Sequence, residues 1–368
     1  MGVESLTAFL KKQYNNTNGY ITSLDMTKIQ RVAIDGNQEM NRIMKVNWKT
    51  LFESMEDPLS DITEDQEKFV RQEWIKDMIR FIMKWLEIKV TPIFIIDGKS
   101  QVAKTAQKEK RQKARDSALQ RYEELKKKVQ QEQTNKDLNQ WSVSTQSISD
   151  EDLAKIVSYR QQERSLSPVW IQELKDVFDA IGVPWIQATD EGEKLCCMLY
   201  LEEVDAVYSN DTDCLLYGCH NTINSFKLEI SGNSLTMPIY NLNDILEKLK
   251  LNHEEFLDFC IMLGTDFNEN IPSIGPVKAL ELIQTHHSIS NLPAFYKKIP
   301  LDRSVLNEDI CKQIYKRVPS GSVINRRGKN DTLSVQWEYW NYTTELEKYV
   351  GKTGARWIEK DMKKVHSF

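Results

Sequence analysis

Several features that mark other protein classes are missing from this chain. No apolar run is long enough to span a membrane, and the first residues, Met1-Gly2-Val3-Glu4-Ser5-Leu6, match neither a signal peptide nor a myristoylation motif. The six cysteines are mostly in apolar stretches and form no Cys-x-x-Cys pair. This pattern indicates neither a zinc site nor a disulfide framework, so we expect reduced core cysteines in an intracellular protein.

A general excess of basic residues is also missing. The chain has 49 Lys and Arg against 54 Asp and Glu, a net charge of −5, and a sequence pI of about 5.7. This balance argues against a uniformly basic surface for nucleic acid but permits local basic patches. With 368 residues, 40% of them hydrophobic, we expect two or three sub-domains with a substantial core.

Carboxylates gather on both sides of one short segment. Asp190-Glu191-Gly192-Glu193 precedes an apolar helical stretch and a β-branched strand over residues 204–208, and Asp211-Thr212-Asp213 follows it. We place Glu191 and Glu193 at the entry of the helix and expect the other two acids, two apart at a strand end, to share a face. Converging carboxylates repel unless a cation neutralises them, which indicates a divalent-metal site. Two solvated acidic loops are the alternative.

Two further apolar runs end in an aspartate. Residues 31–37 and 91–98 are β-rich without alternation and deliver Asp35 and Asp97 to turns, which is typical of a parallel sheet covered on both faces. A helical pattern over residues 69–85, with a capping box at Thr63 and Gln66, supplies the crossover. Since ligand sites lie at the carboxyl ends of such strands, we expect these aspartates to meet the acids near residue 211.

A basic stretch follows directly after Asp97. Between residues 99 and 128, basic residues outnumber acids in a long helical pattern: Lys104, Lys108, Lys110, Arg111, Lys113, Arg115 and Arg121. A solvated charged helix is the alternative, but the position beside an acid cluster favours phosphate binding. Residues 129–152 are rich in Gln, Asn and Ser and read as a mobile segment or the cap of an insertion.

A second unit begins near residue 256 and reads as helix, hairpin, helix. The first helical run ends at Leu263-Gly264-Thr265-Asp266, and the second follows Ser273-Ile274-Gly275-Pro276. Pro276 suits a first helical position, and free N–H groups around it could bind a DNA phosphate with added charge from Lys278. An ordinary tight helical turn is the alternative.

Taken in order, these motifs resemble the flap endonuclease/XPG family of structure-specific 5′ nucleases. The match runs from Met1-Gly2 to about residue 292. The resemblance implies an α/β fold with a mixed, mainly parallel central sheet flanked by helices, PIN/resolvase-like, with a helical arch and a helix-two-turn-helix. It divides the chain into a nuclease region (1–115), an arch or cap insertion (116–167), an internal nuclease region (168–250), the helix-two-turn-helix (251–300) and a divergent C-terminal region (301–368).

The resemblance also implies roles for individual residues. Asp35, Asp97, Glu191 and Glu193 resemble the ligands of a first Mg²⁺ (or Mn²⁺), and Asp211, Asp213 and Asp266 those of a second, while Asp190 is a bystander. Lys104 and Arg111 match arch residues that contact the scissile phosphate, where a cation stabilises transition-state charge. The implied DNA contacts are Gly2, Lys99, Arg115, Gly264, Ser273, Ile274, Gly275 and Lys278.

The chain departs from the family in four places, one of which is the long insertion between Asp97 and Glu191. Ser273 replaces the first glycine of the hairpin's Gly-Ile-Gly, where K⁺ is a candidate ligand, and Asn41 stands where an aromatic often stacks on a substrate base. Beyond residue 300 the resemblance fades, without a sliding-clamp motif, and the divergent tail looks more like that of a viral or otherwise specialised member.

The resulting hypothesis is a monomeric, magnesium-dependent endonuclease that cleaves branched or flapped DNA in replication, repair or recombination. It implies the nucleus, including a host nucleus, or a cytoplasmic viral replication site, and no membrane. A catalytically inactive junction-binding module is the main alternative, although all seven acids are present. Within the family, a Holliday-junction resolvase or a 5′-to-3′ exonuclease would carry the same motifs.

Overall fold

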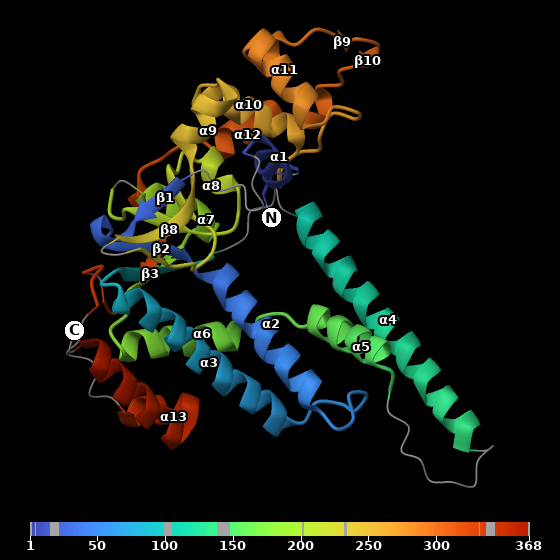
Figure 1. The fold of residues 1–368 in the computed structure, drawn as a ribbon, viewed down its shortest axis with the longest axis vertical. Helices are drawn as coiled ribbons and strands as arrows, with labels where there is room; N and C mark the ends of the chain where they lie inside the picture. The colour runs from blue at the N-terminus through green and yellow to red at the C-terminus, as the bar shows by residue number, and fades with distance from the viewer. Residues whose placement is uncertain are drawn as a thin grey trace. The chain divides into compact units, whose positions relative to one another are not determined.

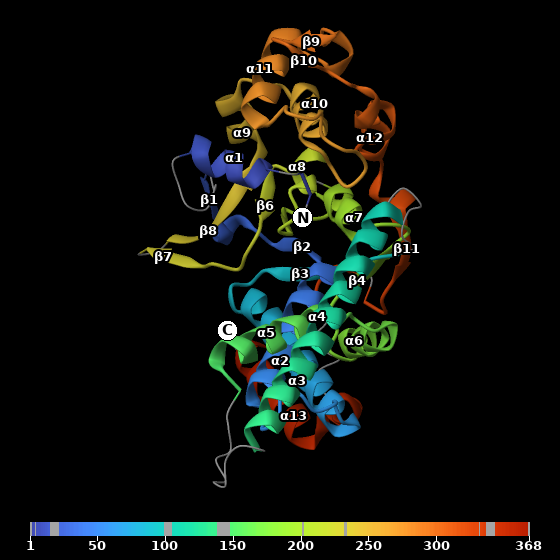
Figure 2. The same ribbon diagram turned by 90° about the vertical axis from the view of Figure 1, so that its right-hand side faces the viewer.

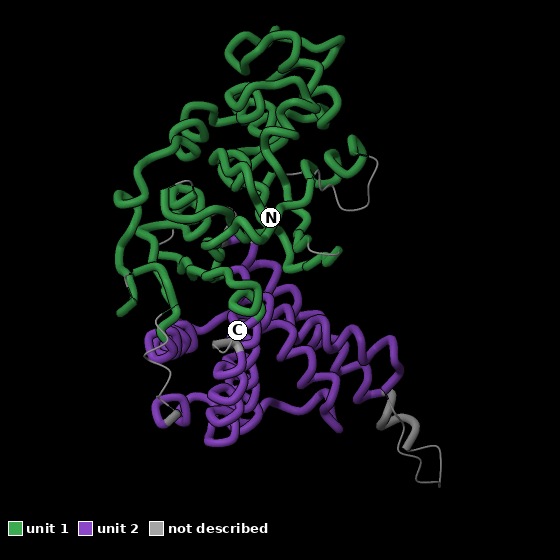
Figure 3. The backbone as a smooth tube through the Cα atoms, turned by 60° about the vertical axis from the view of Figure 1, so that its left-hand side comes forward, with its two compact units in different colours: residues 1–37, 84–104, 182–336 green, residues 38–83, 105–181, 337–368 purple. Residues whose placement is uncertain are grey.

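The chain folds into two compact units, each assembled from separate stretches of sequence (Figure 3). The structure is a computed structural model and describes residues 2–3, 5–14, 22–98, 105–137, 148–200, 202–231, 234–330, 332–335 and 343–366. Unit 1 comprises residues 1–37, 84–104 and 182–336, and unit 2 residues 38–83, 105–181 and 337–368. Each of the five regions predicted from the sequence is a continuous stretch of the chain, and their assignment as functional regions stays a prediction.

Unit 1 is built on a mixed sheet in the order β1-β8-β6-β5-β2-β3-β4-β11, with β7 paired to β8 (Figures 1 and 2). The strands from β6 to β4 are parallel to one another, and antiparallel strands extend both edges. This confirms an α/β fold with a mostly parallel centre. The strands are β1 (Thr22–Asp25), β2 (Arg31–Asp35), β3 (Thr91–Ile96), β4 (Trp185–Ala188), β5 (Ala206–Tyr208), β6 (Asn221–Ile223), β7 (Glu229–Ser231), β8 (Ser234–Asn241) and β11 (Ile324–Arg327).

Strands β2 and β3 form the centre of the sheet and end at predicted site residues. Ala33 pairs with Ile93, and Asp35 pairs with Ile95. Both strands are buried along almost their whole length, which explains why neither sequence alternates between apolar and polar residues. Strand β2 ends at Asp35, and Asp97 follows the last residue of β3. Both predicted strands are confirmed.

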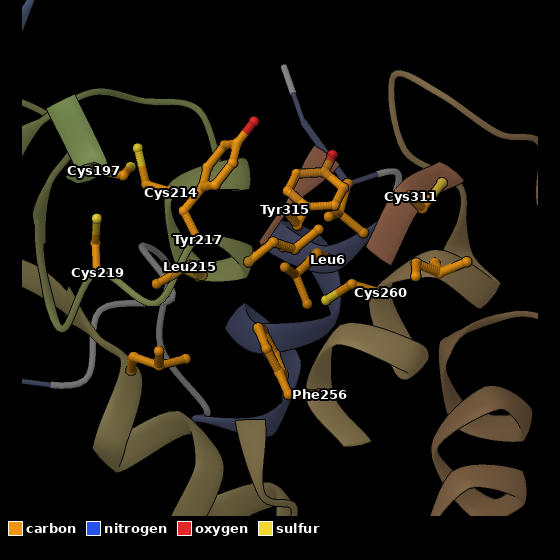
Figure 4. Packing of buried hydrophobic residues seen from close by; sticks show 14 of the residues in the cluster. Leu6, Cys197, Cys214, Leu215, Tyr217, Cys219, Phe256, Cys260, Cys311 and Tyr315 are labelled. Carbon is orange, nitrogen blue, oxygen red and sulfur yellow. The ribbon is translucent and has the colours of Figure 1, made fainter. Parts of the chain in front are cut away.

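The helices of unit 1 share one continuous core with the sheet. Helix α7 packs on β2, β3 and β4, and the buried cluster includes Leu6, Phe256 and the cysteines near them (Figure 4). All six cysteines are free thiols and buried, as expected of core residues. The helices are α1 (Leu6–Gln13), α7 (Gly192–Leu199), α8 (Asp213–Leu216), α9 (Leu242–Leu249), α10 (His253–Leu263), α11 (Pro276–His286) and α12 (Glu308–Ile314), with a small hairpin of β9 (Phe295–Tyr296) and β10 (Ile299–Pro300).

The predicted pair of helices with a turn between them is present as α10 and α11. Asn252 and Glu255 form a capping box at the start of α10, and α11 begins with Pro276 directly after Gly275. The capping box satisfies backbone N–H groups that the first turn would otherwise leave without partners, and a proline at the first position removes one such donor. Local signals therefore set where each helix begins.

Unit 2 is helical. Its helices are α2 (Gly36–Ser54), α3 (Glu64–Glu87), α4 (Thr105–Asp137), α5 (Asp150–Glu163), α6 (Pro168–Ala180) and α13 (Thr343–His366), of which α2 and α3 begin and end, respectively, in unit 1. Trp170 packs against Trp48 and Trp74 with ring centroids 6.3 and 5.5 Å apart. The capping box before α3 is confirmed, because Thr63 N donates to Gln66 Oε1 at 3.0 Å and Gln66 N to Thr63 Oγ1 at 3.2 Å.

Helix α4 and the helix beside it, α5, correct the prediction for residues 129–152. Residues 129–137 continue α4 and residues 150–152 start α5, where a mobile segment or the cap of an insertion was expected, so the described residues of this stretch are helical. Residues 138–147 lie outside the described part. Tyr122, Leu125, Val129 and Ile156 pack together between the helices, and the buried Arg160 donates to the carbonyls of Pro58 and Ser60 at 2.6 and 3.0 Å. The polar composition concealed this narrow apolar stripe. In the described part of the chain, no helix is both long and apolar enough to cross a membrane.

Candidate metal centre

Three of the predicted acids form a close, buried group in unit 1. Glu193, Asp211 and Asp213 each place one carboxylate oxygen within 4.8 Å of the other two. Their exposed fractions are 9%, 5% and 2%. Among the residues that the structure describes, no other group of acids, cysteines or histidines meets this criterion. Burial of three like charges so close together is unfavourable unless a cation neutralises them.

The local structure explains how these side chains come together. Glu191 is the N-cap of α7 and Glu193 is in its first turn, as the sequence predicted. The reason given for the other two acids was wrong, because β5 ends at Tyr208 and Asp213 is the first residue of α8. The loop closes through a local hydrogen bond from Asp213 N to Asp211 Oδ1 at 3.2 Å. The turn into α8, and not the end of β5, therefore brings Asp211 and Asp213 together.

The aspartates at the ends of β2 and β3 are hydrogen-bonded into the same acidic loops. Ser209 Oγ donates to Asp35 Oδ2 at 3.2 Å and accepts from Asp211 N at 3.1 Å. Gly192 N donates to Asp97 Oδ1 at 2.8 Å, which links Asp97 to the start of α7. Asp35 is thus linked to the loop of Asp211 through one hydroxyl group, and Asp97 is linked to the start of α7 through one peptide N–H.

The group of three contains acids that were predicted to bind different ions. Glu193 was assigned to the first ion, whereas Asp211 and Asp213 were assigned to the second. The structure brings one acid of the first set together with two of the second. Asp35, Asp97, Glu191 and Asp266 are not members of this group. Their assignment as ligands, and the division of all seven acids between two ions, stay predictions.

Gly2 lies directly against the acid group. Its φ is +85°, and a Cβ added there would come within 2.1 Å of Asp211 Oδ1 and 2.8 Å of Asp213 Oδ1. The next residue, Val3, donates its N–H to Thr212 Oγ1 at 2.9 Å. Only glycine combines this backbone conformation with so close an approach. The N-terminal segment is therefore a wall of the candidate site.

Tyr315, which follows α12, is a further residue in contact with the acid group and was not among the residues predicted from the sequence. Its hydroxyl donates to Asp213 Oδ2 at 2.7 Å, and its ring packs on Tyr217 with centroids 5.0 Å apart (Figure 4). Burial, reinforced by the charge of Asp213, raises the pKa of Tyr315 well above its ordinary value, so the phenol stays a proton donor. No signal in the sequence pointed to this residue, since 102 positions separate it from its partner.

The donor set fits a hard divalent cation. Every member of the group of three is a carboxylate, and oxygen ligands suit Mg²⁺ or Mn²⁺. Among the thiols, Cys214 Sγ donates a long hydrogen bond to Glu193 Oε1 at 3.9 Å. The hydrogen bond with Cys197 lowers the pKa of Cys214, but burial and the neighbouring charges together outweigh it and raise the pKa to about 11. A neutral thiol is a poor metal ligand, so the chemistry of the site rests on its carboxylates.

The predicted phosphate-binding residues of the basic stretch lie on α4 in unit 2 or outside the described residues. Lys99 and Lys104 lie outside the described residues. Arg111 is exposed, and Arg115 is half-buried and donates to Gln112 Oε1 at 2.8 Å. Between residues 111 and 117 the helix has no buried side chain, and the next residue, Ala118, is buried. Of the cations in this described stretch, Arg111 and Lys113 are therefore exposed to solvent.

The turn before α11 combines strain with a lysine contact. Gly264 has a φ of +93°, and Ser273 adopts a φ of +66°, a left-handed conformation that favours glycine. Lys278 Nζ donates to the carbonyl of Ser273 at 2.9 Å. Ile274 is buried, whereas a Cβ at Gly275 would meet nothing within 4 Å. Lys278 thus braces the turn, a role that the sequence did not suggest.

Two family models match this chain. The model described as the XPG N-terminal domain matches residues 1–118, and the one described as the XPG I-region matches residues 182–266. Together they cover more than half of the sequence, including all seven predicted metal ligands. Tyr315, Lys278 and the turn that Lys278 braces lie beyond both matches.

Curated relatives and a solved structure agree with these matches. The probable RAD2-like endonuclease 369L of Invertebrate iridescent virus 6 is 27% identical over 319 residues, which are 80% of this chain and 74% of that protein. Flap endonuclease 1 of Encephalitozoon cuniculi (strain GB-M1) is 30% identical over 213 residues, 57% of this chain and 54% of that protein.

The catalytic core of Rad2 in complex with DNA substrate superimposes with a TM-score of 0.55 at 15% identity and covers 99% of both chains. At this identity the likeness shows the fold alone, and the alignment with the flap endonuclease spans about half of that protein. The family models, the fold and the buried acid group agree in one conclusion: the chain belongs to the XPG/flap endonuclease family of structure-specific nucleases.

Proposed function

We propose that this chain is a magnesium-dependent endodeoxyribonuclease that cuts branched DNA at single-strand/double-strand junctions, 5′ flaps first among them. The buried group of Glu193, Asp211 and Asp213 carries the proposal. Three carboxylates with little exposure have no structural need to converge, and they cost stability without a cation. A nuclease needs such a set to hold divalent ions beside a phosphodiester.

The proposed mechanism assigns work to this chain's own residues. Asp35, Asp97, Glu191 and Glu193 would hold one ion, and Asp211, Asp213 and Asp266 would hold the other. When bound, the pair of ions supplies charge stabilisation to the attacking and leaving oxygens of an in-line displacement. The burial of the acid group keeps water away from these carboxylates, which strengthens their hold on a cation. Gly2 allows the N-terminal backbone to lie directly against Asp211.

The DNA contacts extend the proposal beyond the acid group. Helix α4 is proposed as the arch, with Lys104 and Arg111 as the cations at the scissile phosphate. Helices α10 and α11 are proposed as the helix-two-turn-helix that binds duplex backbone, with K⁺ as a candidate ligand of its turn. The curated relatives named as flap and RAD2-like endonucleases support this substrate class.

Cellular context follows from the substrate. DNA replication, repair or recombination would use such an activity, in a nucleus or at a cytoplasmic viral replication site. The similarity to an endonuclease of an iridescent virus supports a viral setting. We propose a monomer that acts without a sliding-clamp motif.

A cleavage assay tests the proposal. Substrates with a 5′ flap, a nick, a Holliday junction or a single strand would be incubated with wild type or Asp213→Asn, in Mg²⁺ or EDTA. We expect flap cleavage that requires Mg²⁺ and is lost in the variant. Cleavage in EDTA, or full activity of Asp213→Asn, would refute the metal assignment. Tight junction binding without any cleavage would favour the inactive binding module, and preference for the Holliday junction would favour a resolvase.

A further inference from the structure

One residue that lies outside the segments matched by the family models contacts the acid group through its side chain. Tyr315 follows α12, in the part of the chain where the sequence resemblance has faded. It is 3% exposed, and its partner Asp213 is 2% exposed. The C-terminal part of unit 1 therefore contributes a hydroxyl to a site whose acids come from residues 35–266.

The hydrogen bond itself is short and shielded from solvent. Tyr315 Oη and Asp213 Oδ2 are 2.7 Å apart, within the usual range for a hydroxyl that donates to a carboxylate. A hydrogen bond to a charged acceptor in a buried setting is stronger than one between neutral groups. It therefore restrains the rotation of the Asp213 carboxylate, which has one oxygen committed to the phenol.

The phenol is itself held in place from two sides. Its ring lies 5.0 Å from that of Tyr217 at a tilt of 59° and 5.8 Å from that of Phe267 at 79°. Tyr217 caps α8, the helix that Asp213 begins, and Phe267 directly follows Asp266. The rings of Tyr217 and Tyr315 lie side by side with their hydroxyls on the same side (Figure 4). The donor thus has a defined position before any ligand binds.

We propose that Tyr315 is a positioning residue for the candidate metal centre, whose hydroxyl orients the Asp213 carboxylate to take a divalent cation. The inference rests on the proposed function, because it assumes that Asp213 is a metal ligand. Groups that hydrogen-bond to a ligand fix its direction, and their loss lowers metal affinity about 10- to 100-fold in characterised sites. Nothing in either family match assigns this work to a residue near position 315.

The test removes one oxygen atom and keeps the ring. Tyr315→Phe retains the packing on Tyr217 and Phe267, so its thermal unfolding in EDTA should stay close to that of wild type. Mn²⁺ binding to the DNA-free full chain would be measured by calorimetry, with an expected loss in affinity of about tenfold. Single-turnover cleavage should fall at low Mn²⁺ and recover when the Mn²⁺ concentration is raised, which a loss of packing would not produce.

A second tyrosine provides the matched control. Tyr296 donates to Glu281 Oε2 at 2.6 Å and is 9% exposed, so Tyr296→Phe removes the same kind of hydrogen bond outside the acid group. It should leave Mn²⁺ affinity unchanged. Equal affinities for wild type and Tyr315→Phe would overturn the inference alone, as would equal losses in both variants. Failure of wild type to bind Mn²⁺ would refute both the inference and the metal site, whereas Mn²⁺ binding without cleavage would refute only the proposed activity.

Discussion

Glu193, Asp211 and Asp213 in unit 1 are almost wholly buried, whereas Arg111 and Lys113 on α4 in unit 2 are exposed. Asp213 N donates to Asp211 Oδ1 within the turn, and Tyr315 donates to Asp213. Asp211 N donates to Ser209 Oγ, which in turn donates to Asp35 at the end of β2. Around the two cations, the helix has no buried side chain from residue 111 to 117. The proposed metal ligands are thus fixed by burial and hydrogen bonds, whereas the two cations lie on an exposed stretch of helix.

This difference reflects the chemistry that each region is proposed to perform. Metal ligands must hold their oxygens within fractions of an ångström, which requires a rigid, buried frame. Cations that meet a flexible DNA backbone act over longer distances, and an exposed helix serves them. We therefore expect substitutions in the acid group to lower cleavage far more than substitutions in the basic region do.

The largest effect is expected at Asp213. Asp213→Asn keeps the size of the side chain but removes the charge of a proposed ligand, so single-turnover cleavage should fall by about 10³-fold, equivalent to several kcal/mol of transition-state stabilisation. Quantitative cleavage of a 5′-flap duplex checks this. Binding of the same DNA in EDTA should change little, and a parallel loss of both would show that the variant had simply misfolded.

The next effect is expected at Gly2. Gly2→Ala places a methyl group within 2.1 Å of Asp211 Oδ1 in a backbone conformation unfavourable to alanine. Displacement of that carboxylate should lower Mn²⁺ affinity and cleavage by about 10- to 100-fold. Gly321→Ala is the control, because a Cβ there meets nothing within 4 Å. If both variants bind Mn²⁺ as wild type does, the N-terminal segment is not a wall of the site.

A smaller effect is expected on α4. Arg111→Ala should slow single-turnover cleavage by about tenfold or more, while equilibrium binding of duplex DNA weakens only slightly, if the guanidinium acts at the scissile phosphate. Lys113→Ala, an exposed neighbour on the same helix, provides the comparison. Similar losses in rate and in binding for Arg111→Ala would make it an ordinary backbone contact and weaken the contrast between the two regions.

The smallest effect is expected at Lys278. Lys278→Ala should weaken DNA binding a few-fold on every substrate and lower the salt dependence of binding by about one phosphate contact. Titrations at several salt concentrations measure this slope, with Lys363→Ala on α13 as the control. Because Lys278 also donates to Ser273 O, a weaker binding constant with an unchanged slope would mean that the lysine acts by bracing the turn.

Much of the fold could be predicted from local patterns. The runs that end at Asp35 and Asp97 are strands because apolar residues without alternation suit a sheet covered on both faces. The capping box at Thr63 and the helix start at Pro276 were also predicted correctly, because each of these signals acts within one turn of helix. The start of α5 at residues 150–152 was assigned to a polar segment because the apolar stripe of this helix is short and is completed by α4.

The sequence by itself determined which elements form and which acids are available, because strand burial, capping and turns depend on neighbouring residues. Only the tertiary structure decided which acids meet. It grouped Glu193 with Asp211 and Asp213 across the predicted division, placed Gly2 against them, and brought Tyr315 to Asp213 from 102 positions away. Such contacts follow from the packing of the whole unit, and no local pattern of residues encodes them.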